Sequence, residues 1–247
     1  MITTLWKRLK QKATKLKAIL RPVPPRRVPP NPPRSQQDIV DEFHKLFYQT
    51  GLLSGHGTWM DTYWLGVPLK KCPFDLWIYQ ELMSELRPDV VVESGTGHGG
   101  SALFMASVCD LLGHGRVITI DVEQYEDRPT HERVTYLLGS STSPNIVAQV
   151  RTLVRDEDTV LVLLDSDHSK EHVLRELEIY GQFVTIGSYI IVEDTNIHGH
   201  PVLPEHPPGP MEAVEEFLQD NSSFVVDRTR EKFYLTHNPK GYLRRTA

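Results

Sequence analysis

Two groups of polar residues follow apolar runs in the second half of the chain. The run VLVLLDSDH ends in Asp165, Asp167 and His168, and the run YIIVED ends in Glu193 and Asp194. If both runs are parallel strands of one sheet, these carboxylates meet at one edge and repel each other. A hard divalent cation such as Mg²⁺ removes the repulsion and leaves coordination positions for substrate oxygens. The pattern therefore predicts a metal site, with His168 close enough to act as a general base.

The same residues also have a structural interpretation. DSDH is a suitable helix N-cap, and the acidic pair at 193–194 could simply end a strand. Capping does not explain why two acidic clusters occupy matching strand ends. The metal site is therefore the favoured interpretation.

A glycine-rich turn follows an earlier apolar run. In VVESGTGHGG, residues 91–100, the glycines at 95, 97 and 100 match G-x-G-x-x-G, and a helix can begin near Ser101. Such a turn lets backbone N–H groups approach a ligand closely, although glycines also merely shape turns. About 20 residues later, the run RVITID ends in Asp121, the position that binds a ribose in doubly wound folds. The ligand predicted here is NAD or S-adenosylmethionine.

Glu93 distinguishes these two cofactors. It lies on the apolar run, two residues before Gly95. A carboxylate there would repel the pyrophosphate of NAD, whereas it favours the ammonium and sulfonium groups of S-adenosylmethionine. Together with the acidic clusters, this residue favours S-adenosylmethionine.

The charge of the 247-residue chain is distributed unevenly. Residues 1–34 hold 10 of the 27 lysines and arginines and no acidic residue, which leaves 17 basic and 32 acidic residues elsewhere, a formal net charge of −15. So acidic a domain is a poor nucleic-acid binder. The two cysteines, Cys72 and Cys109, form neither a disulfide framework nor a zinc motif, which favours a reducing, cytoplasmic compartment.

Residues 1–34 form a region of their own. Apolar and basic residues alternate at helical spacing over 1–21, which predicts a basic amphipathic helix. Such a helix could lie on the anionic inner surface of the membrane, or it could dock on its own domain or on another subunit. The sequence favours neither interpretation over the other. Seven prolines in residues 21–34 predict an extended spacer. The folded domain is therefore expected at 35–247.

The folded part alternates between strand and helix patterns. Strands are expected near 89–93, 116–121, 134–138, 160–165 and 189–193, and helices near 39–48, 76–86, 101–112, 144–154 and 169–181. This alternation predicts a Rossmann-like α/β fold: a mostly parallel sheet with helices on both faces and ligands at the carboxyl ends of its strands. Two further strands, 224–227 and 233–236, would complete seven strands as an antiparallel C-terminal hairpin.

The motifs between residues 57 and 245 resemble one family. It is the cephalosporin-hydroxylase-like family, and the segments that resemble it are TYWLGVPLKKCPFDLWIYQE, RPDVVVESGTGHGGSALFMAS, THERVTYLLGSSTSP, LVLLDSDHSKEHVLRELEIY and GSYIIVEDTNIHGHPVLPEHPPGPMEAVEEFL. That family is similar to class I, S-adenosylmethionine- and Mg²⁺-dependent O-methyltransferases that act on antibiotics and on rhamnosyl and other sugar hydroxyls. The chain is more distantly similar to macrolide-sugar O-methyltransferases, whose metal motif falls on Asp165, His168, Glu193 and Asp194.

The resemblance implies a reaction and a set of site residues. A hydroxyl of a sugar, glycan or natural product would attack the methyl group of S-adenosylmethionine. Asp165, Glu193 and Asp194 would hold Mg²⁺, and His168 would take the proton. The cofactor would be lined by Glu93, Gly95, Thr96, Gly97 and Ser101 at its methionine end, Asp121 at the ribose, Gly139, Ser140 and Ser141 at the adenine, and Asp165.

Two other functions stay open at this point. A nicotinamide-dependent oxidoreductase fits the glycine pattern, and a non-catalytic, membrane-associated binding module fits residues 1–34. Glu93 and the acidic clusters argue against both. The sequence leaves Asp167 without a role and is compatible with a homo-oligomer. One of the loop histidines His198, His200 and His206 could be a substrate contact or an alternative base, although a single loop histidine is more often solvated.

Overall fold

The computed structural model describes residues 34–51, 55–206 and 208–247. The amphipathic helix and most of the proline-rich spacer expected at 1–34 lie outside the described residues, so the domain boundary stays a prediction. Residues 36–247 form one compact unit. Within the described ranges, no helix is both long and apolar enough to cross a membrane.

A seven-stranded sheet with the order β5-β4-β3-β6-β7-β9-β8 forms the centre of this unit. Its strands are β3 (Val90–Ser94), β4 (Arg116–Asp121), β5 (Val134–Leu138), β6 (Val160–Leu164), β7 (Tyr189–Val192), β8 (Phe224–Val226) and β9 (Tyr242–Arg245). Strands β3 to β7 run parallel, and β9 is antiparallel to both β7 and β8. The predicted Rossmann-like sheet is confirmed. The strand order reverses beside β3, where doubly wound folds bind their ligands.

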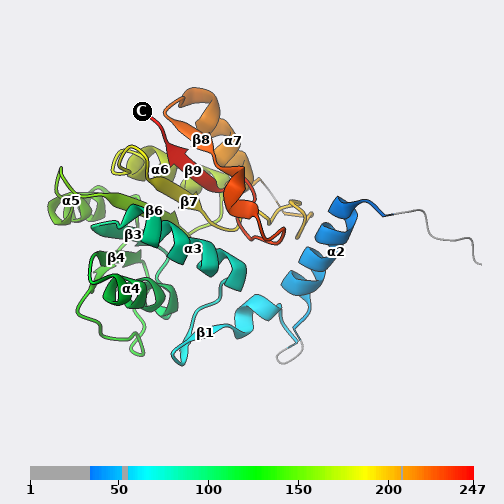
Figure 1. The fold of residues 1–247 in the computed structure, drawn as a ribbon, viewed down its shortest axis with the longest axis horizontal. Helices are drawn as coiled ribbons and strands as arrows, with labels where there is room; N and C mark the ends of the chain where they lie inside the picture. Colours follow the sequence, from blue (N-terminus) through cyan, green and yellow to red (C-terminus); the bar gives the residue numbers. More distant parts are fainter. Residues whose placement is uncertain (1–33, 52–54, 207) are drawn as a thin grey trace, which may run out of the picture. The chain divides into compact units, whose positions relative to one another are not determined.

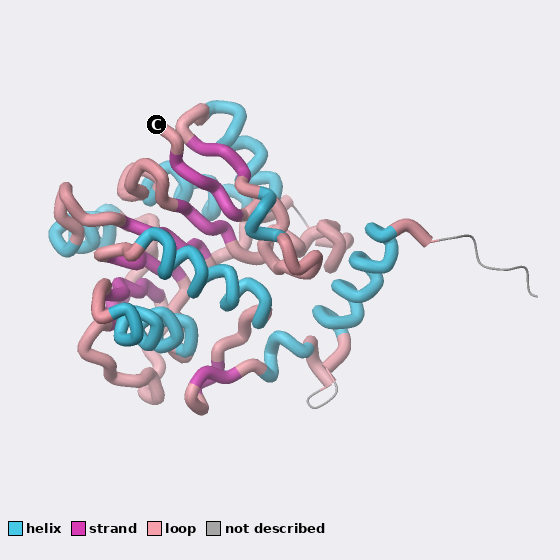
Figure 2. Tube along the Cα trace, viewed as in Figure 1, coloured by secondary structure: helices cyan, strands magenta, loops and turns pink. Residues whose placement is uncertain are grey.

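Helices cover both faces of the sheet (Figure 1, Figure 2). One face carries α3 (Pro73–Leu86) and α4 (Gly100–Leu112), and the other carries α5 (Pro144–Leu153), α6 (Lys170–Tyr180) and α7 (Pro210–Asp220). Side chains alternate across a strand, so Val91 joins the α3 and α4 core while Val90 and Val92 join the opposite one. Because both faces of the sheet are buried, the sequences of the central strands are continuous apolar runs.

Four elements precede α3 in the described part of the chain. They are α2 (Gln36–Gln49), the 3₁₀ helix η1 (Thr58–Asp61), and the strands β1 (Tyr63–Trp64) and β2 (Val67–Pro68), which pair antiparallel. A Cβ at Gly100 would lie 2.2 Å from the carbonyl oxygen of Pro68. The third glycine of the motif therefore lets β2 pack against the start of α4.

The C-terminal strands correct one expectation. Strand β8 lies where a strand was predicted at 224–227, but its partner is β9 at 242–245, not residues 233–236. Thr236 Oγ1 and the backbone N–H of His237 donate hydrogen bonds to Asp75 at the start of α3. The prediction of a strand at 233–236 was wrong because this segment is bound to a buried carboxylate instead of to the sheet.

Candidate active site

A cavity of about 540 Å³ lies at the carboxyl ends of the parallel strands. The loops after β3, β4, β5, β6 and β7 contribute to its wall, together with η1, β2 and Lys70. All predicted cofactor residues line it except Glu93, and so do His168, Asp167 and Asp194. Among the described residues predicted for the site, Glu93 and Glu193 lie behind the wall.

The turn after β3 requires glycine at its first position. Gly95 has φ +88°, and a Cβ there would lie 1.7 Å from the carbonyl oxygen of Asp165. Gly97 also has positive φ, and its N–H donates to Asp121 Oδ2 at 2.8 Å. The glycine turn thus touches the loop after β6 on one side and the end of β4 on the other.

Asp121 is held by three donors. Besides Gly97, Arg128 donates to Oδ2 at 3.0 Å, and the N–H of Glu123 donates to Oδ1 at 2.9 Å. Arg128 also donates to the carbonyl oxygen of Gly97 at 2.8 Å and stacks over Tyr125. The sequence pattern did not reveal Arg128, which fixes the predicted ribose-binding carboxylate against the glycine turn.

The loop after β5 forms the third wall of the cavity. Gly139 has φ +150°, and a Cβ there would approach Ile146 of α5 at 2.8 Å. Next to it, Ser141 Oγ lies 3.2 Å from His172 Nε2, and both residues line the cavity. His172 also lies 3.5 Å from the buried carboxylate of Glu176. His172 is a second residue that sequence analysis missed, because a histidine within a helix carries no pattern of its own.

Glu93 lies fully buried beneath the glycine turn. It accepts a hydrogen bond from Thr119 Oγ1 at 2.6 Å, and Thr119 in turn lies 2.7 Å from Thr96 Oγ1. Burial raises the pKa of Glu93 to about 7, although the charge of Lys71 and a hydrogen bond from Ser101 oppose the shift. The structure thus puts Glu93 behind the cavity-lining residues Thr96 and Ser101 instead of in the wall.

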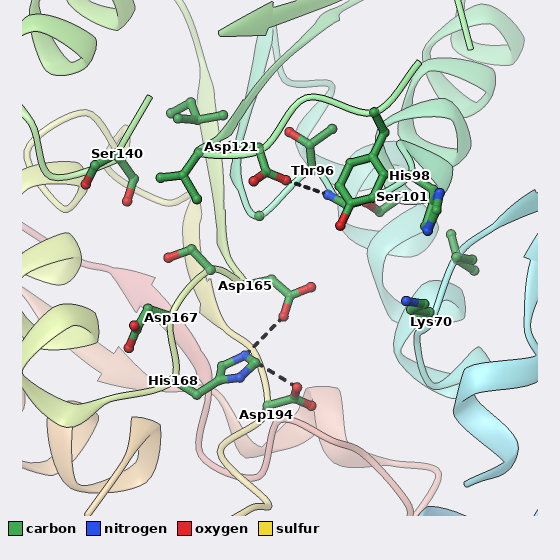
Figure 3. Close-up of a pocket in the computed structure, with 18 of the residues that line it drawn as sticks. Lys70, Thr96, His98, Ser101, Asp121, Ser140, Asp165, Asp167, His168 and Asp194 are labelled. Carbon is green, nitrogen blue, oxygen red and sulfur yellow. Dashed lines mark hydrogen bonds and ion pairs between the residues drawn. The ribbon is translucent and has the colours of Figure 1, made fainter. Parts of the chain in front are cut away.

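His168 lies between two carboxylates on neighbouring strands (Figure 3). Its Nε2 is 3.3 Å from Asp165 Oδ1 and 3.4 Å from Asp194 Oδ2. One ligand atom from each of Asp165, His168 and Asp194 fits within a 4.8 Å span. The structure therefore brings together three of the four residues predicted for the metal and base.

His168 and Asp194 shift each other's pKa values toward the charged forms. Burial alone would lower its pKa, but the hydrogen bond to Asp165 and the charges of Asp194, Asp165 and Glu193 raise it to about 9. Burial would raise the pKa of Asp194, but His237 and His168 hold it below its ordinary value. A protonated His168 would thus neutralise part of the acidic cluster.

Glu193 is paired with a lysine instead of with His168. Its Oε2 lies 2.7 Å from Lys71 Nζ, and the same nitrogen lies 2.6 Å from Asp165 Oδ2. Burial raises the pKa of Glu193, and the Lys71 charge opposes that shift. Glu193 Oε1 is buried and has no hydrogen-bond partner within the described part of the chain. Sequence analysis missed Lys71, since two adjacent lysines before CPFDLW give no sign that one of them is buried.

Several residues without a predicted role have structural contacts. Asp167 points away from the other carboxylates (Figure 3) and accepts from the N–H of Ser169 at 2.7 Å, just before α6. His200 pairs with Glu212 at 2.7 Å, and the rings of His198 and His206 stack at 5.5 Å. Asp167 therefore acts in the structure as a turn residue at the start of α6.

An aromatic cluster lies beyond Asp194. His237 Nδ1 is 3.6 Å from Asp194 Oδ1, and its ring contacts Tyr48 and Trp59 edge-on. His44 of α2 stacks on His237 and accepts a hydrogen bond from Asn196 Nδ2 at 2.9 Å. Because Trp59 also lines the cavity, an aromatic surface flanks its acidic end.

Comparison with known proteins identifies the family. Residues 56–246 match the family model for Rhamnosyl O-methyltransferase/CmcI. The chain belongs to this family. Rhamnosyl O-methyltransferases from Mycobacterium tuberculosis (strain ATCC 25618 / H37Rv) and Mycobacterium leprae (strain TN) are 37% and 36% identical to it. These matches cover 85% of this chain in both cases, and 86% and 92% of the two relatives.

Solved structures of the CmcI family have the same fold. The CmcI-N160 apo structure is similar with a TM-score of 0.62 at 20% identity, covering 92% of this chain and 89% of that one. The CmcI-D160 structure with Mg and SAM gives a TM-score of 0.59 at 19% identity with the same coverage. The resemblance to an S-adenosylmethionine-dependent O-methyltransferase family is confirmed. Neither the oxidoreductase nor the non-catalytic module finds support in these comparisons.

Proposed function

We propose that this protein transfers the methyl group of S-adenosylmethionine to a hydroxyl of a rhamnosyl or related sugar, with Mg²⁺ as a required ion. Family membership supports the reaction, and the name of the mycobacterial relatives supports the acceptor class. The observation that carries the proposal is the meeting of the glycine turn, Asp121 and the acidic cluster in one cavity. Cofactor and acceptor would thus meet at the carboxyl edge of the sheet.

The cofactor fits the half of the cavity around β3, β4 and β5. The positive-φ glycines at 95 and 97 open the wall for close approach, and Asp121 can accept hydrogen bonds from ribose hydroxyls. Gly139, Ser140 and Ser141 would surround the adenine, with His172 next to Ser141. Glu93 would act from behind Thr96 and Ser101, as a buried carboxyl group below the methionine end.

The acidic cluster fits a hard divalent cation. Carboxylate oxygens are the ligands that Mg²⁺ prefers, and it keeps positions open for substrate oxygens. We assign Asp165, Glu193 and Asp194 as the ligands, and the buried, unpartnered Oε1 of Glu193 supports its inclusion. When bound, the ion would lower the pKa of a coordinated hydroxyl and stabilise its developing charge.

His168 is the proposed general base. Its ring lies within 3.4 Å of both Asp165 and Asp194, so it faces the place where an acceptor hydroxyl would bind. The carboxylate charges that raise its pKa are the ones a divalent cation would balance. His168 would therefore lose its own proton and become able to accept that of the acceptor.

The acceptor would enter from the side of Trp59. This side chain lines the cavity and lies against His237, which contacts Asp194. An amphipathic aromatic ring beside the acidic cluster would suit a sugar, which has apolar C–H faces and polar edges. Lys70 lines the same cavity and faces it from the opposite side to His168 (Figure 3).

A calorimetric and radiochemical experiment tests the function. S-Adenosylhomocysteine should bind to the purified protein, and NAD should not. With methyl-labelled S-adenosylmethionine, label should pass to rhamnose-containing glycolipids or glycosides only when Mg²⁺ is present. Binding of NAD, or transfer that needs no hydroxylated acceptor, would contradict the proposal.

We also propose that residues 1–21 contact the inner surface of the membrane in the cytoplasm. The support is their basic, amphipathic pattern, and lipid-linked sugars would bring an acceptor to the same surface. Deleting residues 1–34 should abolish sedimentation with anionic liposomes and leave binding of S-adenosylhomocysteine intact. Full-length protein that stays in the supernatant would favour docking on protein, within one chain or between copies in a homo-oligomer.

A further inference from the structure

Lys71 is the most deeply buried cation near the acidic cluster. Its side chain is 3% exposed, and its nitrogen bridges Asp165 Oδ2 and Glu193 Oε2 at 2.6 and 2.7 Å. It lies between β2 and α3, an element pair distant in sequence from both carboxylates. Burying a lysine is costly unless its charge is paired, so the two contacts account for its position.

The two carboxylates divide their oxygens between separate partners. Asp165 gives Oδ2 to Lys71 and turns Oδ1 toward His168. Glu193 gives Oε2 to Lys71 and keeps Oε1 buried without a partner among the described residues. One oxygen of each carboxylate is thus held by Lys71. The other oxygen lies near His168 in Asp165, and it is buried without a partner among the described residues in Glu193.

We propose that Lys71 is a positioning residue of the metal site, which orients Asp165 and Glu193 so that Oδ1 and Oε1 are available to a divalent cation. The inference rests on the proposed function, since it requires a cation at these oxygens. Lys71 does not line the cavity, so it acts through the carboxylates and not on the cofactor or acceptor. Groups that orient metal ligands commonly account for 10- to 100-fold of metal affinity.

Charge balance supports the same assignment. Asp165, Glu193 and Asp194 carry three negative charges when ionised, and a divalent ion balances two of them. Lys71 supplies the remaining positive charge from the buried side, where solvent cannot. Without it, Glu193 would be a buried carboxylate with neither oxygen paired among the described residues.

Binding of Mn²⁺ to full-length protein, followed by electron paramagnetic resonance, tests the proposal without any turnover. Lys71→Met should weaken Mn²⁺ binding by about 10- to 100-fold. Binding of S-adenosylhomocysteine should stay within about twofold of wild type. Lys232→Met, which removes a surface lysine paired with Glu81, is the matched control and should bind Mn²⁺ as wild type does. A role in folding alone would lower thermal stability without changing the Mn²⁺ affinity of the folded protein.

Lys71→Arg keeps the charge and serves as the second variant if Lys71→Met does not fold. Its larger, planar guanidinium does not fit the position of the compact ammonium group between the two oxygens, so we expect Mn²⁺ affinity to fall here as well. Unchanged or tighter Mn²⁺ binding in a folded Lys71 variant would overturn the proposal and show that Lys71 competes with the ion. Failure of wild-type protein to bind Mn²⁺ would instead overturn the metal site itself, and this inference with it.

Discussion

The two halves of the cavity are held together differently. Around Gly97 and Asp121, the polar groups already have hydrogen-bond partners, whereas around Asp165 and Asp194 the side chains are charged and are stabilised by neighbouring groups of opposite charge. Asp121 accepts hydrogen bonds from three donors, one in the loop after β3 and two in the loop after β4. The acidic cluster instead relies on Lys71 and His168 to balance carboxylates from two strands. The proposed cofactor half is thus held in place by its own hydrogen bonds, whereas the proposed metal half should change its charge balance if an ion binds.

This difference predicts that cofactor binding and chemistry can be separated by mutation. The largest effect should come from Glu193→Gln combined with Asp194→Asn, which keeps shape and removes two charges. Losing the metal-dependent stabilisation, worth several kcal/mol, should reduce methyl transfer by at least about 10³-fold. Binding of S-adenosylhomocysteine, measured by calorimetry, should stay within a few-fold of wild type. Glu215→Gln with Glu216→Gln, an adjacent surface pair on α7, is the charge-matched control.

Removing the base should have the next largest effect. His168→Ala should slow methyl transfer by about 10²- to 10⁴-fold, the usual contribution of a positioned general base. The residual rate should rise with pH, because hydroxide then replaces the missing base. His131→Ala, which removes a histidine paired with Asp110 away from the cavity, provides the control. A His168→Ala enzyme with a wild-type rate would show that the ring only balances charge.

Asp121 tests the other half of the cavity. Asp121→Ala should weaken S-adenosylhomocysteine binding by about 1.5 to 3 kcal/mol for each charge-assisted hydrogen bond lost to the ribose, roughly 10- to 150-fold. Asp127→Ala, in the same loop but paired only at the surface with His98, should change the dissociation constant by less than about fivefold. Equal dissociation constants for wild type and Asp121→Ala would reject the assigned cofactor site.

Glu93 gives the smallest and most specific effect. Its pKa is raised to about 7 in the folded chain, above its ordinary value of 4.5, so the folded state holds a proton that the unfolded state releases. Wild-type protein should therefore lose stability relative to Glu93→Gln as pH rises from 4.5 to 7, by at most roughly 3 kcal/mol. Denaturant unfolding of both proteins over this range measures the difference. A difference that does not change with pH would mean that Glu93 is ionised throughout.

Much of the site was predictable because it follows the ends of parallel strands. Each parallel strand delivers the residue after it to the same edge, so Gly95, Asp121, Gly139 and the two acidic groups could be placed from apolar runs alone. Lys71 and Trp59 could not, because they come from a short connecting segment and a 3₁₀ helix that precede the first strand of the seven-stranded sheet. The hydrophobic pattern of such short segments does not predict where they pack.

The C-terminal strand shows the same limit. Residues 233–236 have a suitable strand pattern, yet Thr236 is bound by Asp75, 161 residues earlier in the chain. Tyr242, in the strand that does pair, donates to the same carboxylate at 2.7 Å. A buried polar contact over this distance in sequence overrides local propensity, which depends on neighbours within a few residues.

The most direct test of the account is methyl transfer from labelled S-adenosylmethionine to a rhamnose-containing acceptor by wild-type protein treated with EDTA. We expect transfer to cease with EDTA and to return when Mg²⁺ is added in excess, while the dissociation constant for S-adenosylhomocysteine stays the same in both states. Transfer that continues unchanged in EDTA would contradict the metal mechanism. It would leave Asp165, Glu193 and Asp194 as structural partners of Lys71 and His168.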